Sequence, residues 1–195
     1  MLTTVFRLLA QARHARAFHP RGVRTTGELR GSAAPFPSEA TVAVRLSKGA
    51  GTGAGWPDVL GLALRIPTGS GDWDLLLSST GTGRWTRMVP KFVRHWRDAR
   101  PGTLAPYRHR GELVWFMAVP DDRETPTRFA VHASGRDARW RRVAELALAP
   151  PDGTAEPVSF DPVRTLPAEL ELVPRWLAVV RAKAYEGSRR GRQVS

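Results

Sequence analysis

The chain has 195 residues, of which 42% are hydrophobic and 25% are charged. This is the composition of a single folded domain rather than of a disordered chain. It contains no cysteine, which excludes disulfide frameworks, thiol nucleophiles and cysteine-ligated zinc or iron–sulfur sites. No apolar run approaches the ~18 residues of a transmembrane helix, so we expect no membrane span.

The formal net charge is +12, and 27 of the 30 basic residues are arginine. Such a charge favours anionic partners, including nucleic acid, phosphates, acidic lipids and carboxylates. A solvated arginine-rich surface explains it equally well. Residues 1–27 contain five arginines and no acid, and Arg7 interrupts their only apolar stretch. A secretory leader is therefore not expected, and we expect a cytoplasmic protein.

Hydrophobic spacing predicts helices at both ends of the chain and one in the middle. Residues 4–13 carry apolar side chains at helical intervals and form the core of an N-terminal helix, residues 1–15. Residues 84–97 repeat this spacing and predict a helix inserted between strands. Residues 168–187, rich in Leu, Ala, Val and Glu, predict the longest helix, within a C-terminal region 168–192.

Extended runs fill the rest of the chain, and we expect seven strands, at residues 22–29, 41–46, 61–66, 73–77, 112–119, 127–133 and 140–148. The third and fourth are separated by Thr68-Gly69-Ser70-Gly71, a sequence typical of a hairpin turn. The pattern predicts one α+β domain spanning residues 1–195, with an antiparallel sheet or barrel in residues 16–167.

Several common catalytic motifs are absent. The glycines in residues 49–55 do not fit a phosphate-binding loop, because Lys48 precedes them, and they do not fit a dinucleotide-binding fingerprint, because Ala54 and Trp56 stand where the last glycine is needed. No GxSxG motif occurs, and the five histidines are too scattered to suggest a metal site. Basic clusters at residues 139–142 and 189–192 lie in no recognisable nucleic-acid-binding module, so no nucleic-acid partner is expected.

Four motifs in the first half of the chain share the order and spacing of a known family. They are Arg16-Ala17-Phe18-His19-Pro20-Arg21-Gly22 with Gly27 eight residues after His19, Val44-Arg45-Leu46-Ser47, Asp58-Val59-Leu60-Gly61-Leu62-Ala63-Leu64-Arg65, and Thr68-Gly69-Ser70-Gly71-Asp72-Trp73-Asp74-Leu75. Together they resemble the RxxHxKG, VRFS, DxxGFAxK and TxxGxWDL segments of haem catalases.

A fifth motif lies near the C-terminus. Arg181, Tyr185 and Arg192 have the RxxxYxxxxxxR spacing with which that family presents its iron-binding tyrosine. Offsets of four and eleven residues place the three side chains on one face of a helix. Neighbouring guanidinium groups lower the pKa of a phenol and favour the phenolate that serves as an axial ligand in catalase.

The resemblance implies a closed antiparallel β-barrel of catalase type with flanking helices, binding haem b. Tyr185 would be the metal ligand, and the cofactor-binding residues would be Arg16, Arg45, Arg181, Tyr185 and Arg192. The catalytic residues would be His19, Ser47 and Ser78. His19 would move a proton between the two peroxide oxygens, with its ring oriented by Ser47.

The chain also departs from the family. Ser78 stands where the distal asparagine is expected, and Gly81-Thr82-Gly83 replace the phenylalanines that follow it. The length leaves no room for the threading arm, the wrapping loop or the C-terminal helical domain, which build a narrow peroxide channel. We therefore expect a haem-dependent peroxidase that acts on organic or lipid hydroperoxides rather than a fast catalase.

The expected partners are a peroxide and a small organic or lipid substrate. Assembly into a homo-oligomer is possible. Two alternatives remain at this point. One is a non-enzymatic or vestigial haem binder with the catalase fold. The other is a haem-free protein of the same fold that binds or hydrolyses phosphoesters, which the arginine excess would suit.

Overall fold

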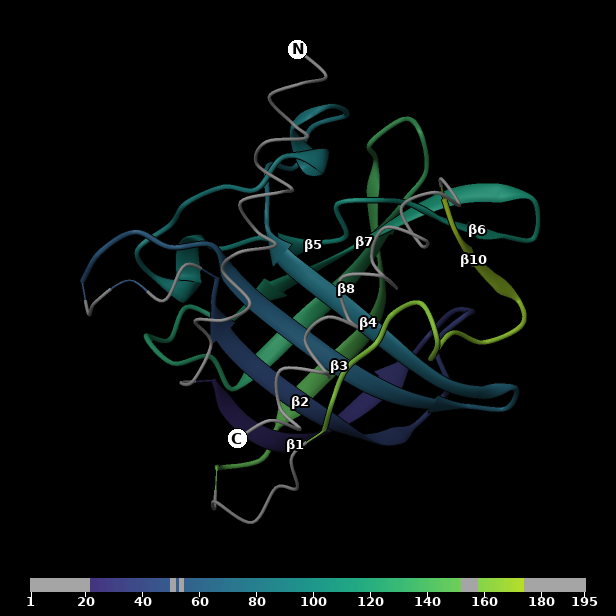
Figure 1. Cartoon of the computed structure of the whole chain (residues 1–195), viewed down its shortest axis with the longest axis horizontal. Helices are drawn as coiled ribbons and strands as arrows, with labels where there is room; N and C mark the ends of the chain where they lie inside the picture. Colours follow the sequence, from purple (N-terminus) through teal and green to yellow (C-terminus); the bar gives the residue numbers. More distant parts are fainter. Residues whose placement is uncertain (1–21, 50–51, 53–54, 152–157, 174–195) are drawn as a thin grey trace, which may run out of the picture.

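The computed structural model describes residues 22–49, 52, 55–151 and 158–173, and these form a β-barrel (Figure 1). Its strands are β1 (Val23–Gly31), β2 (Ala40–Lys48), β3 (Leu60–Thr68), β4 (Gly71–Ser79), β5 (Pro101–Gly102), β6 (Tyr107–His109), β7 (Glu112–Pro120), β8 (Arg128–Ser134), β9 (Trp140–Leu148) and β10 (Leu170–Leu172). All of their pairings are antiparallel.

Eight strands close the barrel. The order β1-β2-β3-β4-β5-β7-β8-β9 returns to β1 through the β1–β9 pairing. Strands β6 and β10 extend the sheet from β7 and lie outside the closed circuit. Closure removes the exposed edges that an open antiparallel sheet would present to solvent.

Period-two alternation explains why these segments form barrel strands. In β3 the side chains of Leu60, Leu62, Leu64 and Ile66 are buried, and the intervening residues are only partly buried. The same alternation in β2 and β4 directs one set of side chains into the barrel and the other set outward. Burial of these apolar side chains is the main driving force for closure.

Aromatic side chains fill the barrel near the β3–β4 hairpin. The Trp73 ring lies 5.3 Å from the rings of Phe36 and Phe116 and 5.6 Å from that of Tyr107, centroid to centroid. At the hairpin itself, Gly71 has a φ of +123°, which side-chain-bearing residues rarely adopt. The opposite mouth is closed by a small cluster of Leu60, Val93 and Ala99.

The barrel has one narrow join. Strand β5 forms two residue pairs with β4 and one pair, Gly102 with Met117, with β7. Thr103 extends this join, because its N–H donates to the Phe116 carbonyl at 2.9 Å and its hydroxyl accepts from the Phe116 N–H at 3.1 Å. The Thr103 hydroxyl thus accepts the Phe116 N–H in place of a backbone carbonyl of a neighbouring strand.

The antiparallel barrel and the seven strands agree with the sequence analysis, but the α+β class with flanking helices is wrong. No helix of seven or more residues occurs in the part of the chain that the structure describes. The expected helix at 84–97 is replaced by two 3-10 turns, η2 (Thr86–Met88) and η3 (Trp96–Asp98). Pro90 cannot donate a helical hydrogen bond and disrupts a helix interior.

The expected C-terminal helix does not begin at residue 168. Instead, β10 (Leu170–Leu172) pairs with β6, because Leu170 and Leu172 alternate with Glu171 and are both buried. The N-terminal helix 1–15 and residues 174–192 lie outside the described residues. Within the described ranges, no helix is long and apolar enough to cross a membrane.

Candidate functional site

Three of the predicted site residues lie in the described part of the chain, on two strands of the barrel. Arg45 and Ser47 belong to β2, and Ser78 belongs to β4. All three occupy outward positions of their strands, because Leu46 and Leu77 beside them point into the core. The other predicted site residues, Arg16, His19, Arg181, Tyr185 and Arg192, lie outside the described residues.

The two serines lie in one row across the sheet. Ser47 pairs with Gly61 of β3, and Gly61 pairs with Ser78. Neighbouring strands are about 4.8 Å apart, so the serine backbones are separated by about 10 Å. We call this outward row, formed by Ser47, Gly61 and Ser78, the serine–glycine face. No side chain on it is longer than a hydroxymethyl group, so a flat group can approach the sheet closely.

Gly61 leaves space for the Ser47 hydroxyl. A Cβ atom on Gly61 would lie 2.8 Å from the Ser47 Oγ atom, closer than carbon and oxygen normally approach. The hydroxyl therefore lies along the sheet toward β3. Gly102 continues the row beside Ser78 and is itself buried.

Arg45 occupies the next outward row of β2. It pairs with Ala63, which in turn pairs with Leu76 of β4. A Cβ atom on Gly22 would lie 2.6 Å from the Arg45 Nε atom, so the arginine side chain passes over the start of the described chain at β1. Arg45 thus provides positive charge at the side of the serine–glycine face where the Arg16–Gly22 motif ends.

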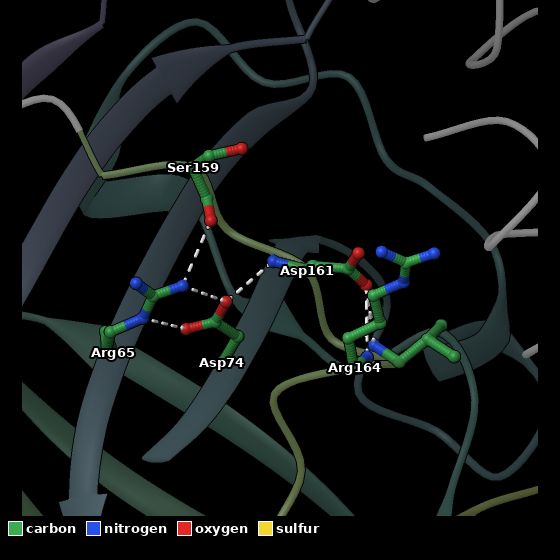
Figure 2. A network of polar contacts seen from close by, with 6 residues as sticks. Arg65, Asp74, Ser159, Asp161 and Arg164 are labelled. Carbon is green, nitrogen blue, oxygen red and sulfur yellow. Dashed lines mark hydrogen bonds and ion pairs between the residues drawn. The ribbon is translucent and has the colours of Figure 1, made fainter. Parts of the chain in front are cut away.

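A buried ion pair bounds the same outer surface of β3 and β4 further along the strands (Figure 2). Asp74 is fully buried and accepts two hydrogen bonds from Arg65, from Nε and Nη2, each at 2.7 Å. It also accepts the Asp161 N–H at 2.6 Å. The carboxylate raises the pKa of Arg65, chiefly through these hydrogen bonds.

The ion pair holds residues 158–165, which we call the strap, across the two strands. Arg65 Nη2 donates to the Ser159 carbonyl at 3.0 Å, and the Asp74 N–H donates to the Thr165 carbonyl at 2.9 Å. Asp161 closes a turn within the strap by accepting the N–H groups of Val163 and Arg164. Figure 2 shows Arg65, Asp74, Ser159, Asp161 and Arg164 linked in this network. The sequence did not indicate this network, because the strap lies more than eighty residues along the chain from Arg65 and Asp74.

A cavity of about 340 Å³ lies at the hairpin end of the barrel, away from the serine–glycine face. Its lining includes Thr68, His109 and Glu169. Burial lowers the pKa of His109, with Arg110 contributing, and a hydrogen bond from Ser70 lowers the pKa of Glu169. Across the described residues, no group of three or more His, Asp or Glu side chains is arranged to hold a metal ion.

Sequence analysis also missed the exposed aromatic side chains near the end of β4. Trp85 and Phe92, whose spacing predicted a helix, are largely exposed. Their segment is tied to β4, because the Lys91 N–H donates to the Ser79 carbonyl at 2.7 Å and the Ser79 hydroxyl donates to the Lys91 carbonyl at 2.6 Å. The aromatic segment therefore passes beside Ser79 at the end of β4.

Comparison with known proteins relates this arrangement to one fold. No protein-family model matches the sequence, and no curated protein matches it either. Among solved structures, the chain is similar to catalase A from Saccharomyces cerevisiae, with a TM-score of 0.59 and 13% identity. The likeness covers 93% of this chain and 63% of that catalase, so the chain spans less than two thirds of its length. The described barrel therefore has a catalase-like fold.

Proposed function

We propose that this protein binds haem b against the serine–glycine face and metabolises peroxides, acting as a peroxidase on organic or lipid hydroperoxides. The observation that carries the proposal is the placement of Ser47, Ser78 and Arg45 on one outward surface of a catalase-like barrel. These are the described residues to which the sequence resemblance assigns catalytic and cofactor-binding roles.

The described residues fit a flat, anionic macrocycle. The Ser47–Gly61–Ser78 row presents only small groups, and a Cβ atom at Gly61 would already crowd the Ser47 hydroxyl. Arg45 supplies a guanidinium that suits a propionate carboxylate. In the proposal, Arg16, Arg181 and Arg192 add further positive charge, and Tyr185 provides the phenolate ligand.

Bound haem would supply the redox chemistry of peroxide O–O cleavage. The protein's own contribution is proton transfer and orientation. His19 accepts a proton from one peroxide oxygen and returns it to the other, which a neutral imidazole can do near pH 7. In the proposal, the Ser47 hydroxyl would hydrogen-bond the imidazole ring and fix its orientation. The Ser78 hydroxyl offers the peroxide a shorter hydrogen-bonding group than an amide.

The absorption spectrum of the protein after addition of haem tests the cofactor assignment. The wild type should develop a Soret band at one equivalent of haem. Tyr185→Phe should weaken haem binding at least about tenfold, since a lost iron–oxygen bond exceeds 1.4 kcal/mol. Tyr107→Phe removes the other tyrosine hydroxyl of the chain and should bind haem as the wild type does. A wild type that takes up no haem at saturating supply contradicts the proposal.

Gly61→Ala tests the role of the serine–glycine face. The new methyl group must displace the Ser47 hydroxyl, which is the mobile end of a side chain, so the stability change should stay below about 1 kcal/mol. Loss of one hydrogen bond that orients His19 should lower peroxide turnover by about fivefold. Gly69→Ala, which meets no atom within 4 Å, is the matched control. Equal turnover in the two variants would remove Ser47 from the proposed mechanism.

A further inference from the structure

Exposed apolar side chains mark the end of the barrel away from the β3–β4 hairpin. The described residues include five exposed large apolar side chains, Val23, Trp56, Trp85, Val89 and Phe92, and four of them lie on two neighbouring segments. Three of them lie within residues 84–97. Trp56 joins them because the bridge between Asp58 and Val93 brings its loop against that segment. Figure 1 shows both segments away from the β3–β4 hairpin. Trp56 is 71% exposed and Trp85 is 69% exposed, unusually high values for the largest apolar side chain.

The same segment is strongly basic. Residues 75–97 contain no Asp or Glu, and Arg84, Lys91, Arg94 and Arg97 are all exposed. In the described part of the chain none of these four forms an ion pair, whereas Arg30, Arg139 and Arg142 elsewhere each lie within 4.0 Å of a carboxylate. The positive charge here is thus available to an external anion.

The backbone beneath these side chains is firmly held. Asp58 and Val93 exchange two backbone hydrogen bonds of 2.9 Å. Arg87 is buried, with its guanidinium 3.6 Å from the centre of the Trp115 ring, and it donates to the Gly135 carbonyl at 2.7 Å. Val93 and Ala99 pack into the cluster that closes the barrel mouth. Exposure of Trp85 and Phe92 is therefore a property of the fold rather than of a loose loop.

We propose that this basic–aromatic surface, formed by Trp56, Arg84, Trp85, Val89, Lys91, Phe92, Arg94 and Arg97, docks on the surface of a bilayer that contains anionic lipids. Tryptophan and phenylalanine rings gain free energy at the boundary between headgroups and acyl chains. Arginine and lysine at the same level pair with lipid phosphates. The aliphatic Val89 favours acyl chains over stacked bases, which distinguishes this surface from one for single-stranded nucleic acid. The inference does not depend on the proposed haem chemistry.

Co-sedimentation of the full chain with vesicles tests the proposal. Vesicles of phosphatidylcholine with one third phosphatidylglycerol should bind the protein, and pure phosphatidylcholine vesicles should bind it much less. Arg94→Gln with Arg97→Gln should weaken partitioning about 25-fold, or about fivefold per charge. The control, Arg30→Gln with Arg110→Gln, removes the same charge from exposed positions at the hairpin end. It should weaken partitioning onto the vesicles less than fivefold. All variants are first checked for unchanged thermal unfolding.

The apolar side chains are tested separately. Trp85→Ala with Phe92→Ala should lower partitioning at least about tenfold, whereas Val23→Ala should leave it unchanged. Equal losses for the Arg94/Arg97 and the Arg30/Arg110 variants would overturn the proposal, because vesicle binding would then follow net charge alone. The proposal also fails if vesicles do not bind, or if the surface variants lose affinity for a single-stranded oligonucleotide while vesicle binding is retained.

Discussion

Replacing Asp74 with alanine should lower the free energy of unfolding by about 3 kcal/mol. The substitution removes both hydrogen bonds from Arg65 and the acceptor of the Asp161 N–H. This loss of stability lies at the low end of the range for breaking a buried ion pair, because the Arg65 side chain is 29% exposed and can turn toward water. Thermal denaturation should show a midpoint lower by about 6–12 °C.

The exposed pair of Arg30 and Glu39 is the matched control for Asp74. Their side chains are 74% and 62% exposed, with an Nε to Oε1 distance of 3.1 Å. Glu39→Ala should therefore cost less than about 1 kcal/mol. If Asp74→Ala cost no more than Glu39→Ala, the ion pair beneath the strap would contribute nothing to the stability of the barrel.

Replacing His19 with alanine should keep the haem spectrum and lower peroxide turnover by about 10²–10⁴-fold. The variant keeps every proposed group that binds the cofactor and loses only the group that transfers the proton. The measurement pairs the Soret absorbance with the steady-state rate for an organic hydroperoxide. The separation of binding from turnover distinguishes a peroxidase from a haem carrier with the same fold.

His14→Ala is the control for His19, since it removes an imidazole from the same acid-free segment, five residues earlier. It should leave both spectrum and turnover at wild-type values. If His19→Ala also left turnover unchanged, the protein would bind haem without using this histidine, and the resemblance would describe the fold alone.

The strands were predictable because their pattern is local. In β3 and β4, alternating apolar residues and the Thr68-Gly69-Ser70-Gly71 turn define the pairing of Leu64 with Leu75 through short-range sequence alone. Of the candidate site, sequence analysis also selected Arg45, Ser47 and Ser78, which the structure brings to one surface. Their proposed roles stay predictions.

The prediction of a helix at residues 84–97 was wrong, because the spacing of apolar residues alone cannot show what each side chain packs against. Val93 is buried, but Phe92 and Trp85 point outward, so the apolar positions do not form one packed face. Pro90 instead bridges to Thr80. The predicted helix from residue 168 is wrong because Leu170 and Leu172 pair with β6, more than sixty residues earlier in the chain. This tertiary pairing overrides local helix propensity.

The narrow join at β5 has a consequence for measuring ligand binding. A join of so few ladder pairs should open at a lower free energy than the long β3–β4 ladder, so its amide protons should exchange with solvent early. Ser78 pairs with Gly102 of this join, which places the serine–glycine face directly beside it. A ligand lying across both strands would hold the join closed. Slower deuterium uptake at the amides of Gly102 and Thr103 would then report occupancy of the face, even for a colourless ligand.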